Sequence, residues 1–144
     1  MRHHDLLYGE WELPPIVAEL FRTKELARLR DISQTTIPNI FLPRGSVSSR
    51  AHHGLGVARL TEIVLRENPS LAPYRETLYA ASLLHDAGNP PFCHLTEPFL
   101  RAAHDGKDGE SFLEEVLSES EAEHVLLRYG VQSRDVLVFV TGSL

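Results

Sequence analysis

The sequence has 144 residues, of which 42% are hydrophobic and 24% are charged, and its formal net charge at pH 7 is −6. This length and composition predict one soluble globular domain with its own core. The negative charge argues against general capture of DNA, RNA or an anionic membrane, although local basic positions can still bind phosphate. The single cysteine, Cys93, excludes an internal disulfide and a zinc site built from cysteines.

No stretch of the sequence has the form of a membrane-directing segment. No run approaches the roughly 20 apolar residues of a transmembrane helix. The N-terminal stretch MRHHDLLYGEWELPP also lacks the apolar region that a signal peptide needs. We therefore expect a cytoplasmic protein with no membrane partner.

Hydrophobic spacing predicts helices along nearly the whole chain, because apolar residues recur three and four positions apart. Leu55, Leu60, Ile63 and Val64 are candidate core positions on the longest of these helices. The elements expected in the first half are a helix opened by Pro14 and Pro15, a helix capped by Thr23, a loop over residues 33–48, a helix from Ser48 or Ser49 to Arg66, and a turn over residues 68–73.

The second half is predicted to begin with a central, buried helix over residues 74–85, which is apolar on several sides near its end. A Gly-Asn-Pro-Pro break over residues 88–91 stops that helix. The tail over residues 135–140 is β-like by local propensity, but a lone strand would have no partner, so we expect a final helix. Further helices are expected over residues 94–104, 112–117 and 121–129, with a polar loop over residues 104–109. The sequence thus predicts an all-α bundle of about six or seven helices.

Residue types that bind metals occur at the ends of two of these helices. His53 lies near the start of one in SSRAHHGLGVARL, and His85 and Asp86 end the next in LLHDAGNPPFCHLTE. Antiparallel packing would place all three at the same end of the bundle. Imidazole and carboxylate groups suit Mn, Fe, Zn or Ni, and a divalent ion would offset the cost of burying Asp86. Adjacent residues point apart on a regular helix, so joint ligation by the His-Asp pair requires the helix to end there.

Each of these residues also has an ordinary interpretation when taken alone. A single histidine at a helix end is more often a solvated or hydrogen-bonded surface group than a ligand. A His-Asp pair at a helix C-terminus can simply place an imidazole near the negative end of the helix dipole. The order and spacing of several segments together favour the functional interpretation.

Four segments in order resemble the HD superfamily of metal-dependent phosphohydrolases, and within it the dGTPase-like branch of deoxynucleoside triphosphate triphosphohydrolases. These segments are YGEWELPP, ELARLRDISQT, SRAHHGLGVARL and LLHDAGNPPFCHLTE. The resemblance implies a single HD-domain helical bundle over residues 1–144. It also implies a divalent metal ion as cofactor, for which Mn, Fe, Ni, Zn and Mg are the candidates.

The resemblance implies a role for particular residues of the site. It implies that His53, His85 and Asp86 are metal ligands. It also implies that His94 is the catalytic histidine and that Glu97 orients its ring. A carboxylate one helical turn away can fix the tautomer of an imidazole and raise its basicity.

Two further residues match positions that contact the substrate in this branch. Arg50 matches an arginine that contacts the substrate phosphates, and Gln34 matches a glutamine that contacts the nucleoside sugar. The implied partner is a nucleotide or another phosphorylated small molecule. In the triphosphohydrolase branch, attack at the α-phosphorus releases deoxynucleoside and tripolyphosphate.

The late aspartate that completes the metal site in this family has no evident counterpart. Asp135 is the only aspartate after Asp108, and within QSRDVLVF it resembles an ordinary helix-start residue. The chain therefore resembles either a naturally short member or a fragment of a longer one. One alternative function is a non-catalytic module that binds metal, nucleotide or a partner. Another is a homo-oligomer in which a second subunit donates the missing carboxylate.

Overall fold

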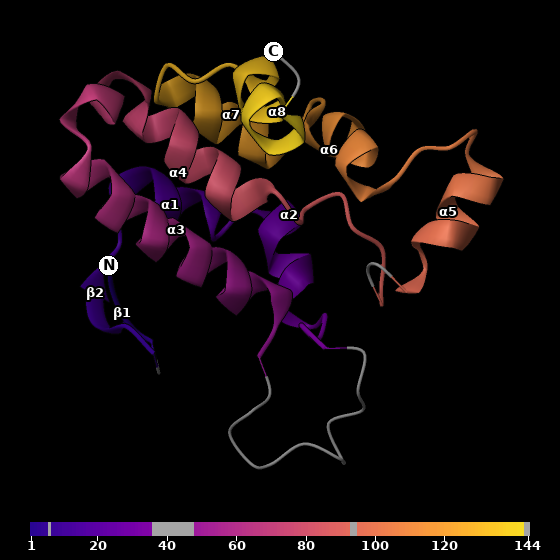
Figure 1. The fold of residues 1–144 in the computed structure, drawn as a ribbon, viewed down its shortest axis with the longest axis horizontal. Helices are drawn as coiled ribbons and strands as arrows, with labels where there is room; N and C mark the ends of the chain where they lie inside the picture. The colour runs from indigo at the N-terminus through magenta and orange to yellow at the C-terminus, as the bar shows by residue number, and fades with distance from the viewer. Residues whose placement is uncertain (6, 36–47, 93–94, 143–144) are drawn as a thin grey trace.

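The computed structural model describes residues 1–5, 7–35, 48–92 and 95–142 (Figure 1). Within these ranges the chain forms eight α-helices, of which α2 is a single turn, so the predicted all-α class is confirmed. None of the described helices is long and apolar enough to cross a membrane. The elements are, in chain order, β1 (Arg2–Asp5), β2 (Gly9–Glu12), α1 (Pro15–Leu20), α2 (Lys24–Ala27), the 3₁₀ helix η1 (Arg28–Arg30), α3 (Arg50–Glu67), the 3₁₀ helix η3 (Pro69–Tyr74), α4 (Arg75–Leu84), α5 (Glu97–Ala103), α6 (Gly109–Leu117), α7 (Glu121–Arg128) and α8 (Ser133–Thr141).

A β-hairpin that the sequence did not indicate precedes the first helix. Asp5 shapes its turn, because the carboxylate Oδ1 accepts the backbone N–H groups of Leu7 at 2.7 Å and Tyr8 at 2.9 Å. The two strands are antiparallel, with His3 opposite Trp11. Trp11 belongs to the core cluster, so the hairpin is packed onto the bundle through this one large ring.

Helix α4 is central and buried, as the sequence predicted. It packs against α3, α1 and α8, and Figure 1 shows it lying beside α3. The predicted final helix is also confirmed, as α8, and it covers part of α4. The buried residues of α4 are Tyr79, Ala80, Ala81, Leu83 and Leu84.

Helix α3 meets α4 through small residues, and two of the predicted core positions are wrong. Leu60 and Val64 are 46% and 48% exposed, because they lie on the outer side of the helix. At Gly54 the two helices are so close that an added Cβ would lie 3.1 Å from the carbonyl oxygen of Leu83. The apolar residues and glycine that α3 buries are Ala51, Gly54, Leu55, Ala58 and Leu65.

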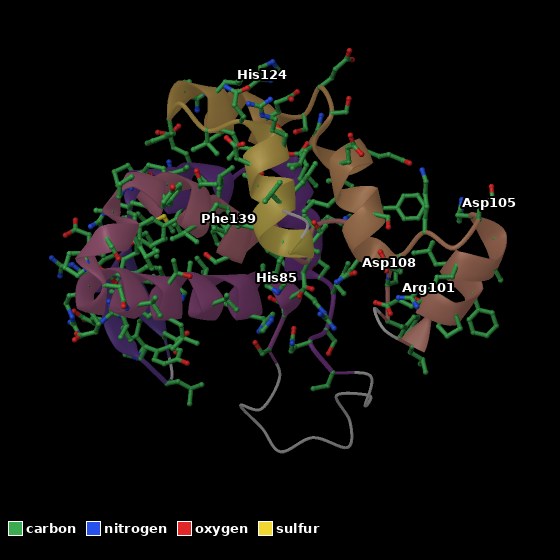
Figure 2. All side chains as sticks on the ribbon, turned by 45° about the horizontal axis from the view of Figure 1, so that its top comes forward. His85, Arg101, Asp105, Asp108, His124 and Phe139 are labelled. Atoms are coloured by element: carbon green, nitrogen blue, oxygen red, sulfur yellow. The ribbon has the colours of Figure 1, made fainter. Side chains whose placement is uncertain are left out.

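Helix α5 stands apart from the rest of the bundle (Figures 1 and 2). It buries none of its residues, and Phe99 is 75% exposed. An ion pair of 3.0 Å joins Arg101 to Asp108, the N-cap of α6 (Figure 2). The helix begins at Glu97, later than the sequence predicted, and residues 93–94 lie outside the described residues.

Candidate metal centre

The first turn of α3 lies at the site. The hydroxyl of Ser49 caps this helix by accepting a backbone N–H of the first turn at 3.3 Å. The backbone N–H of Arg50 donates to the carbonyl oxygen of Ile32 at 2.8 Å. This bond ties the start of α3 to the segment that carries Gln34, so Gln34, Arg50 and His53 are held at the same end of the bundle.

The C-terminal end of α4 supplies the facing part of the site. The helix ends at Leu84, and the backbone continues as a turn in which Ala87 N–H donates to the Leu84 carbonyl at 2.8 Å. Asp86 therefore lies just beyond the regular helix, which frees its side chain to point toward the same region as that of His85. Joint ligation by the adjacent pair required the helix to end at these residues, and the structure meets this condition.

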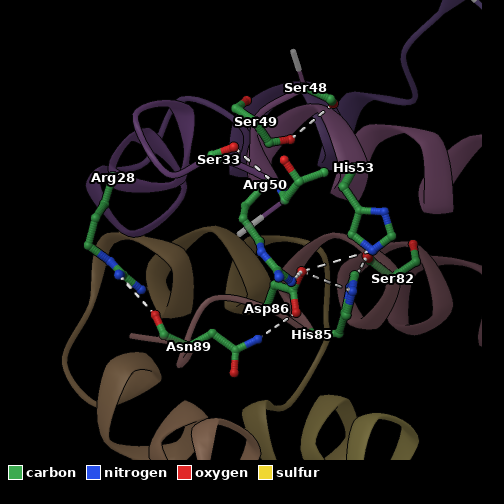
Figure 3. A network of polar contacts seen from close by, with 11 residues as sticks. Arg28, Ser33, Ser48, Ser49, Arg50, His53, Ser82, His85, Asp86 and Asn89 are labelled. Atoms are coloured by element: carbon green, nitrogen blue, oxygen red, sulfur yellow. Dashed lines mark hydrogen bonds and ion pairs between the residues drawn. The ribbon is translucent and has the colours of Figure 1, made fainter. Parts of the chain in front are cut away.

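His53, His85 and Asp86 converge on one point (Figure 3). One donor atom from each residue lies within 4.8 Å of the other two. The Nε2 atoms of His85 and His53 lie 3.5 Å and 3.9 Å from Asp86 Oδ2. The His85 Nδ1 lies 2.8 Å from the Ser82 carbonyl oxygen, which can only accept, so Nδ1 carries the proton. In its neutral form, His85 therefore directs the lone pair of Nε2 toward a carboxylate oxygen, and a cation can be held between these two atoms.

The protonation state of His53 also suits a metal ligand. Burial lowers the pKa of His53, and the charges of His85 and Arg50 lower it further, against the opposing effect of Asp86. The ring is therefore neutral near pH 7 and can offer a lone pair. Two imidazoles and one carboxylate form a donor set that fits a divalent transition-metal ion.

The Asp86 carboxylate is buried and is held from two sides. Its Oδ2 accepts a hydrogen bond from Arg50 Nη1 at 2.8 Å, and its Oδ1 accepts one from Asn89 Nδ2 at 2.6 Å. Arg50 is only 6% exposed. Because both charges are shielded from water, their pairing removes much of the cost of burying either one.

Asn89 and Arg28 support the site but were not among the residues that the sequence assigned to it. Arg28 donates to the carbonyl oxygens of Ala87 at 2.5 Å and Asn89 at 3.1 Å, which fixes the turn after Asp86 (Figure 3). The position of Asn89 in the GNPP turn could have suggested its role. Arg28 donates to backbone carbonyls, which every residue type has, so the sequence does not indicate these partners.

Close packing against α6 explains the glycine of the same turn. A Cβ on Gly88 would lie 2.1 Å from the carbonyl oxygen of Gly109 and 2.7 Å from the Leu113 nitrogen. A Cβ on Gly109 would lie 1.7 Å from Asn89 Oδ1. Both glycines therefore allow the turn to pack on the start of α6, which holds Asn89 in reach of Asp86.

A cavity of about 330 Å³ lies over the cluster. Gln34 and Glu97 line it from two further directions, and the Oε1 of Gln34 is buried without a hydrogen-bond partner among the described residues. Every predicted site residue except His94 lines this cavity, and His94 lies outside the described residues. The lining residues are Gln34, Arg50, His53, His85, Asp86, Asn89 and Glu97.

In this helical bundle, a histidine of one helix meets a His-Asp pair at the end of the next helix. This arrangement defines the class of protein to which the chain belongs. The sequence profile of the HD domain matches residues 50–137, a segment that contains all three clustered residues. The chain belongs to the HD domain family. The family predicted from the four segments is therefore confirmed.

The chain is also similar in sequence to proteins of several other organisms. The chain is 30% identical over 104 residues to a protein of Dictyostelium discoideum named deoxynucleoside triphosphate triphosphohydrolase SAMHD1 homolog, a match that covers 67% of this chain and 20% of the relative. It is 38% identical over 89 residues to an uncharacterized MG461 homolog of Mycoplasma pneumoniae, covering 59% and 20%. It is 34% identical over 95 residues to the uncharacterized protein YwfO of Bacillus subtilis, covering 62% and 22%. The matches span about a fifth of each relative's own length.

Proposed function

We propose that this chain is a metal-dependent phosphohydrolase that acts on a nucleotide. The observation that carries the proposal is the convergence of His53, His85 and Asp86 beneath a cavity that also contains the Arg50 guanidinium. The Dictyostelium relative supports a narrower version, in which a deoxynucleoside triphosphate is split into deoxynucleoside and tripolyphosphate. A cytoplasmic location stays a prediction from the sequence.

His53, His85 and Asp86 would hold one divalent ion. When bound, such an ion supplies Lewis acidity toward a phosphoryl oxygen and increases the acidity of water. Three protein ligands leave coordination positions open, which is typical of catalytic sites and not of structural ones. The donor set therefore supports an enzyme even without a fourth protein ligand.

Arg50 supplies a fixed positive charge for the phosphate groups. Its Nη1 pairs with Asp86, which uses only one of the five N–H donors of the guanidinium. Because Arg50 lines the cavity, the group can still donate to a phosphate oxygen. A preorganised charge in a partly enclosed cavity stabilises developing negative charge better than a mobile surface charge would. In the same cavity, the Gln34 amide can accept a hydrogen bond from a sugar hydroxyl.

We assign proton transfer to His94, oriented by Glu97. Glu97 lies in the first turn of α5 and lines the cavity. His94 would take a proton from the attacking water or return one to the leaving oxygen. The carboxylate of Glu97 would fix the tautomer of the ring for either step.

The first test is to count metal ions per chain. The purified protein is stripped with a chelator, reloaded with Mn, Fe, Ni or Zn in separate samples, and measured by elemental analysis. We expect about one ion per chain, and binding that is weaker by about a hundredfold or more in Asp86→Asn and in His85→Ala, because each variant loses one donor. Asp135→Asn, which changes a carboxylate in the first turn of α8, is the control and should bind metal as the parent does.

The second part of this test is hydrolysis by the loaded protein. Deoxynucleoside triphosphates and nucleoside monophosphates are supplied, and tripolyphosphate is separated from orthophosphate. We expect Asp86→Asn to lose metal and turnover together, and His94→Ala to lose turnover while retaining metal. Intact activity in His94→Ala would show that its assigned role is wrong. Metal binding without turnover on any of these substrates would favour the non-catalytic module.

A further inference from the structure

A second cavity adjoins the metal centre, between the β-hairpin and the outer side of α3. We call it the hairpin cleft. Its volume is about 620 Å³, within the range of small-molecule pockets. Gln34 and His53 line both this cleft and the cavity over the metal centre. A molecule with its phosphates at Arg50 could therefore extend past Gln34 into the hairpin cleft.

The walls of the hairpin cleft are mainly apolar. Leu7 and Tyr8 come from the hairpin turn, and Val57 and Leu60 come from the outer face of α3. Leu60 is 46% exposed and is not packed in the core, and its position in the wall of the cleft explains this exposure. A surface of this composition favours an uncharged, apolar part of a ligand.

Two of the polar side chains that line the hairpin cleft are engaged with the protein itself. The Asp5 carboxylate accepts the two backbone N–H groups of the hairpin turn. The His52 Nδ1 lies 3.0 Å from the Ser49 hydroxyl. No arginine or lysine is among the described residues that line the cleft. The described lining of the cleft thus offers no guanidinium or ammonium group to a phosphate, whereas the neighbouring cavity is lined by Arg50.

We propose that the hairpin cleft binds the base of the nucleotide whose phosphates lie at the metal centre, an inference that rests on the proposed function. Two features favour a flat heteroaromatic ring over an alkyl chain. The rings of His3 and His52 lie nearly parallel, with an interplanar angle of 22° and centroids 6.3 Å apart, and with Tyr8 they provide aromatic surface for stacking. Gln34, whose amide is polar, lines both cavities, and a sugar that joins the base to the phosphates would pass this residue.

The test uses a nucleoside without phosphate, so that binding depends on neither metal nor hydrolysis. Deoxyguanosine binding to the metal-free protein is measured by ligand-observed NMR. Leu60→Trp fills the cleft without adding charge. Val64→Trp is the matched control, because Val64 lies one turn further along α3, is 48% exposed and does not line the cleft. We expect the affinity to fall by about fivefold or more in Leu60→Trp and to stay unchanged in Val64→Trp.

Gly56→Leu provides a second way to fill the cleft. A Cβ at Gly56 would lie 3.8 Å from Tyr8 Cε2, an ordinary contact, and leucine is a better helix former than glycine. Equal deoxyguanosine binding by the parent and both filled variants would overturn the proposal. Weaker binding of octyl phosphate in both variants with no binding of deoxyguanosine would also overturn it, in favour of an alkyl chain.

The two proposals can fail separately. Deoxyguanosine binding that both filled variants weaken, in a protein that hydrolyses no nucleotide, would support the base site and contradict the phosphohydrolase. Nucleotide hydrolysis with an unchanged KM in both filled variants would support the phosphohydrolase and contradict the base site.

Discussion

Asp86 depends on its neighbours for both its charge and its orientation. Arg50 balances the charge at Oδ2, and Asn89 holds Oδ1, so the plane of the carboxylate is fixed relative to the two histidines. The hydrogen bond from His85 Nδ1 to the Ser82 carbonyl fixes the second donor in the same way. Such supporting bonds tune metal affinity nearly as strongly as the ligands themselves.

We predict that Asn89→Ala weakens metal binding by about 10- to 100-fold, because Asp86 loses one of its two orienting bonds. Titration of the metal-free protein with Mn²⁺, followed by electron paramagnetic resonance, measures the change. Asn68→Ala is the control, since Asn68 is exposed and its side chain donates to the Val64 carbonyl at the far end of α3. An unchanged affinity in Asn89→Ala would show that the Asn89 bond has no part in holding the metal.

At the level of single residues, the sequence indicated groups whose chemistry is distinctive. His53, His85 and Asp86 could be chosen because imidazoles and a carboxylate occur at two helix ends, and the structure places them together. Arg28 could not be chosen in this way. Its hydrogen bonds reach backbone carbonyls about 60 positions along the chain, and any residue type presents the same carbonyl group.

In addition to the hydrophobic core, a polar contact joins α1 to the C-terminal end of α7. The Tyr129 hydroxyl donates to Glu19 at 2.7 Å, and Arg128 donates to the same carboxylate at 2.5 Å. The hydrogen bonds from Arg128 and Tyr129 lower the pKa of Glu19. Burial, the hydrogen bond to Glu19 and the charge of Glu19 raise the pKa of Tyr129 to about 12. The two helices thus share a contact that depends on pH in both directions.

We predict that Tyr129→Phe lowers the thermal midpoint at pH 7 by a few degrees. The folded protein holds the phenol proton more tightly than the unfolded chain, so this stabilisation is complete below pH 10 and is lost as the pH rises toward about 12. The stabilisation by Glu19 depends on pH in the opposite direction, because the pKa of this carboxyl is lowered in the folded protein. That stabilisation is lost as the pH falls below about 4.5. The midpoint of Tyr129→Phe should therefore fall less steeply than that of the parent at alkaline pH.

Circular dichroism across the pH range measures these midpoints. Tyr74→Phe, at a tyrosine that is 52% exposed, is the control and should follow the parent. Parallel alkaline curves for the parent and Tyr129→Phe would contradict the prediction.

The helices could be predicted where apolar residues repeat, but two features of their arrangement could not. The hairpin strands read RHHD and GEWE, and Trp11 is the one large apolar side chain in them, so no alternating pattern marks a strand. On α3 the predicted core position Leu55 is buried, but Leu60 and Val64 were wrongly assigned to the buried face. Helix α4 selects the small residues around Gly54 because they permit close approach, and that preference depends on the partner helix.

Across the whole molecule, stability is expected to be uneven. The core cluster extends from the hairpin through α1, α3 and α4 to α8. Helix α5 contributes no residue to that cluster and stands outside it (Figure 1). A helix that buries no side chain is held by its own short run of hydrogen bonds and by the surface ion pair between Arg101 and Asp108. We therefore expect α5 to open locally while the bundle stays folded.

We predict that the backbone amides of α5 exchange with deuterium within the first time points, and that those of α4 exchange last. Hydrogen exchange followed by mass spectrometry measures both helices in one experiment. Helix α7, of similar length but with three buried residues, is the internal comparison and should be slower than α5. Protection of α5 equal to that of α7 would contradict the prediction and show that another surface covers α5 in solution.

The pairing of Arg50 with Asp86 affects the order in which the protein folds and binds its metal ion. In many small metal-binding domains the unfolded chain needs its ion before it can fold, because nothing else offsets the buried ligands. Here the arginine already provides that balance from within the chain. We therefore expect the metal-free protein to fold and to bind its ion only afterwards.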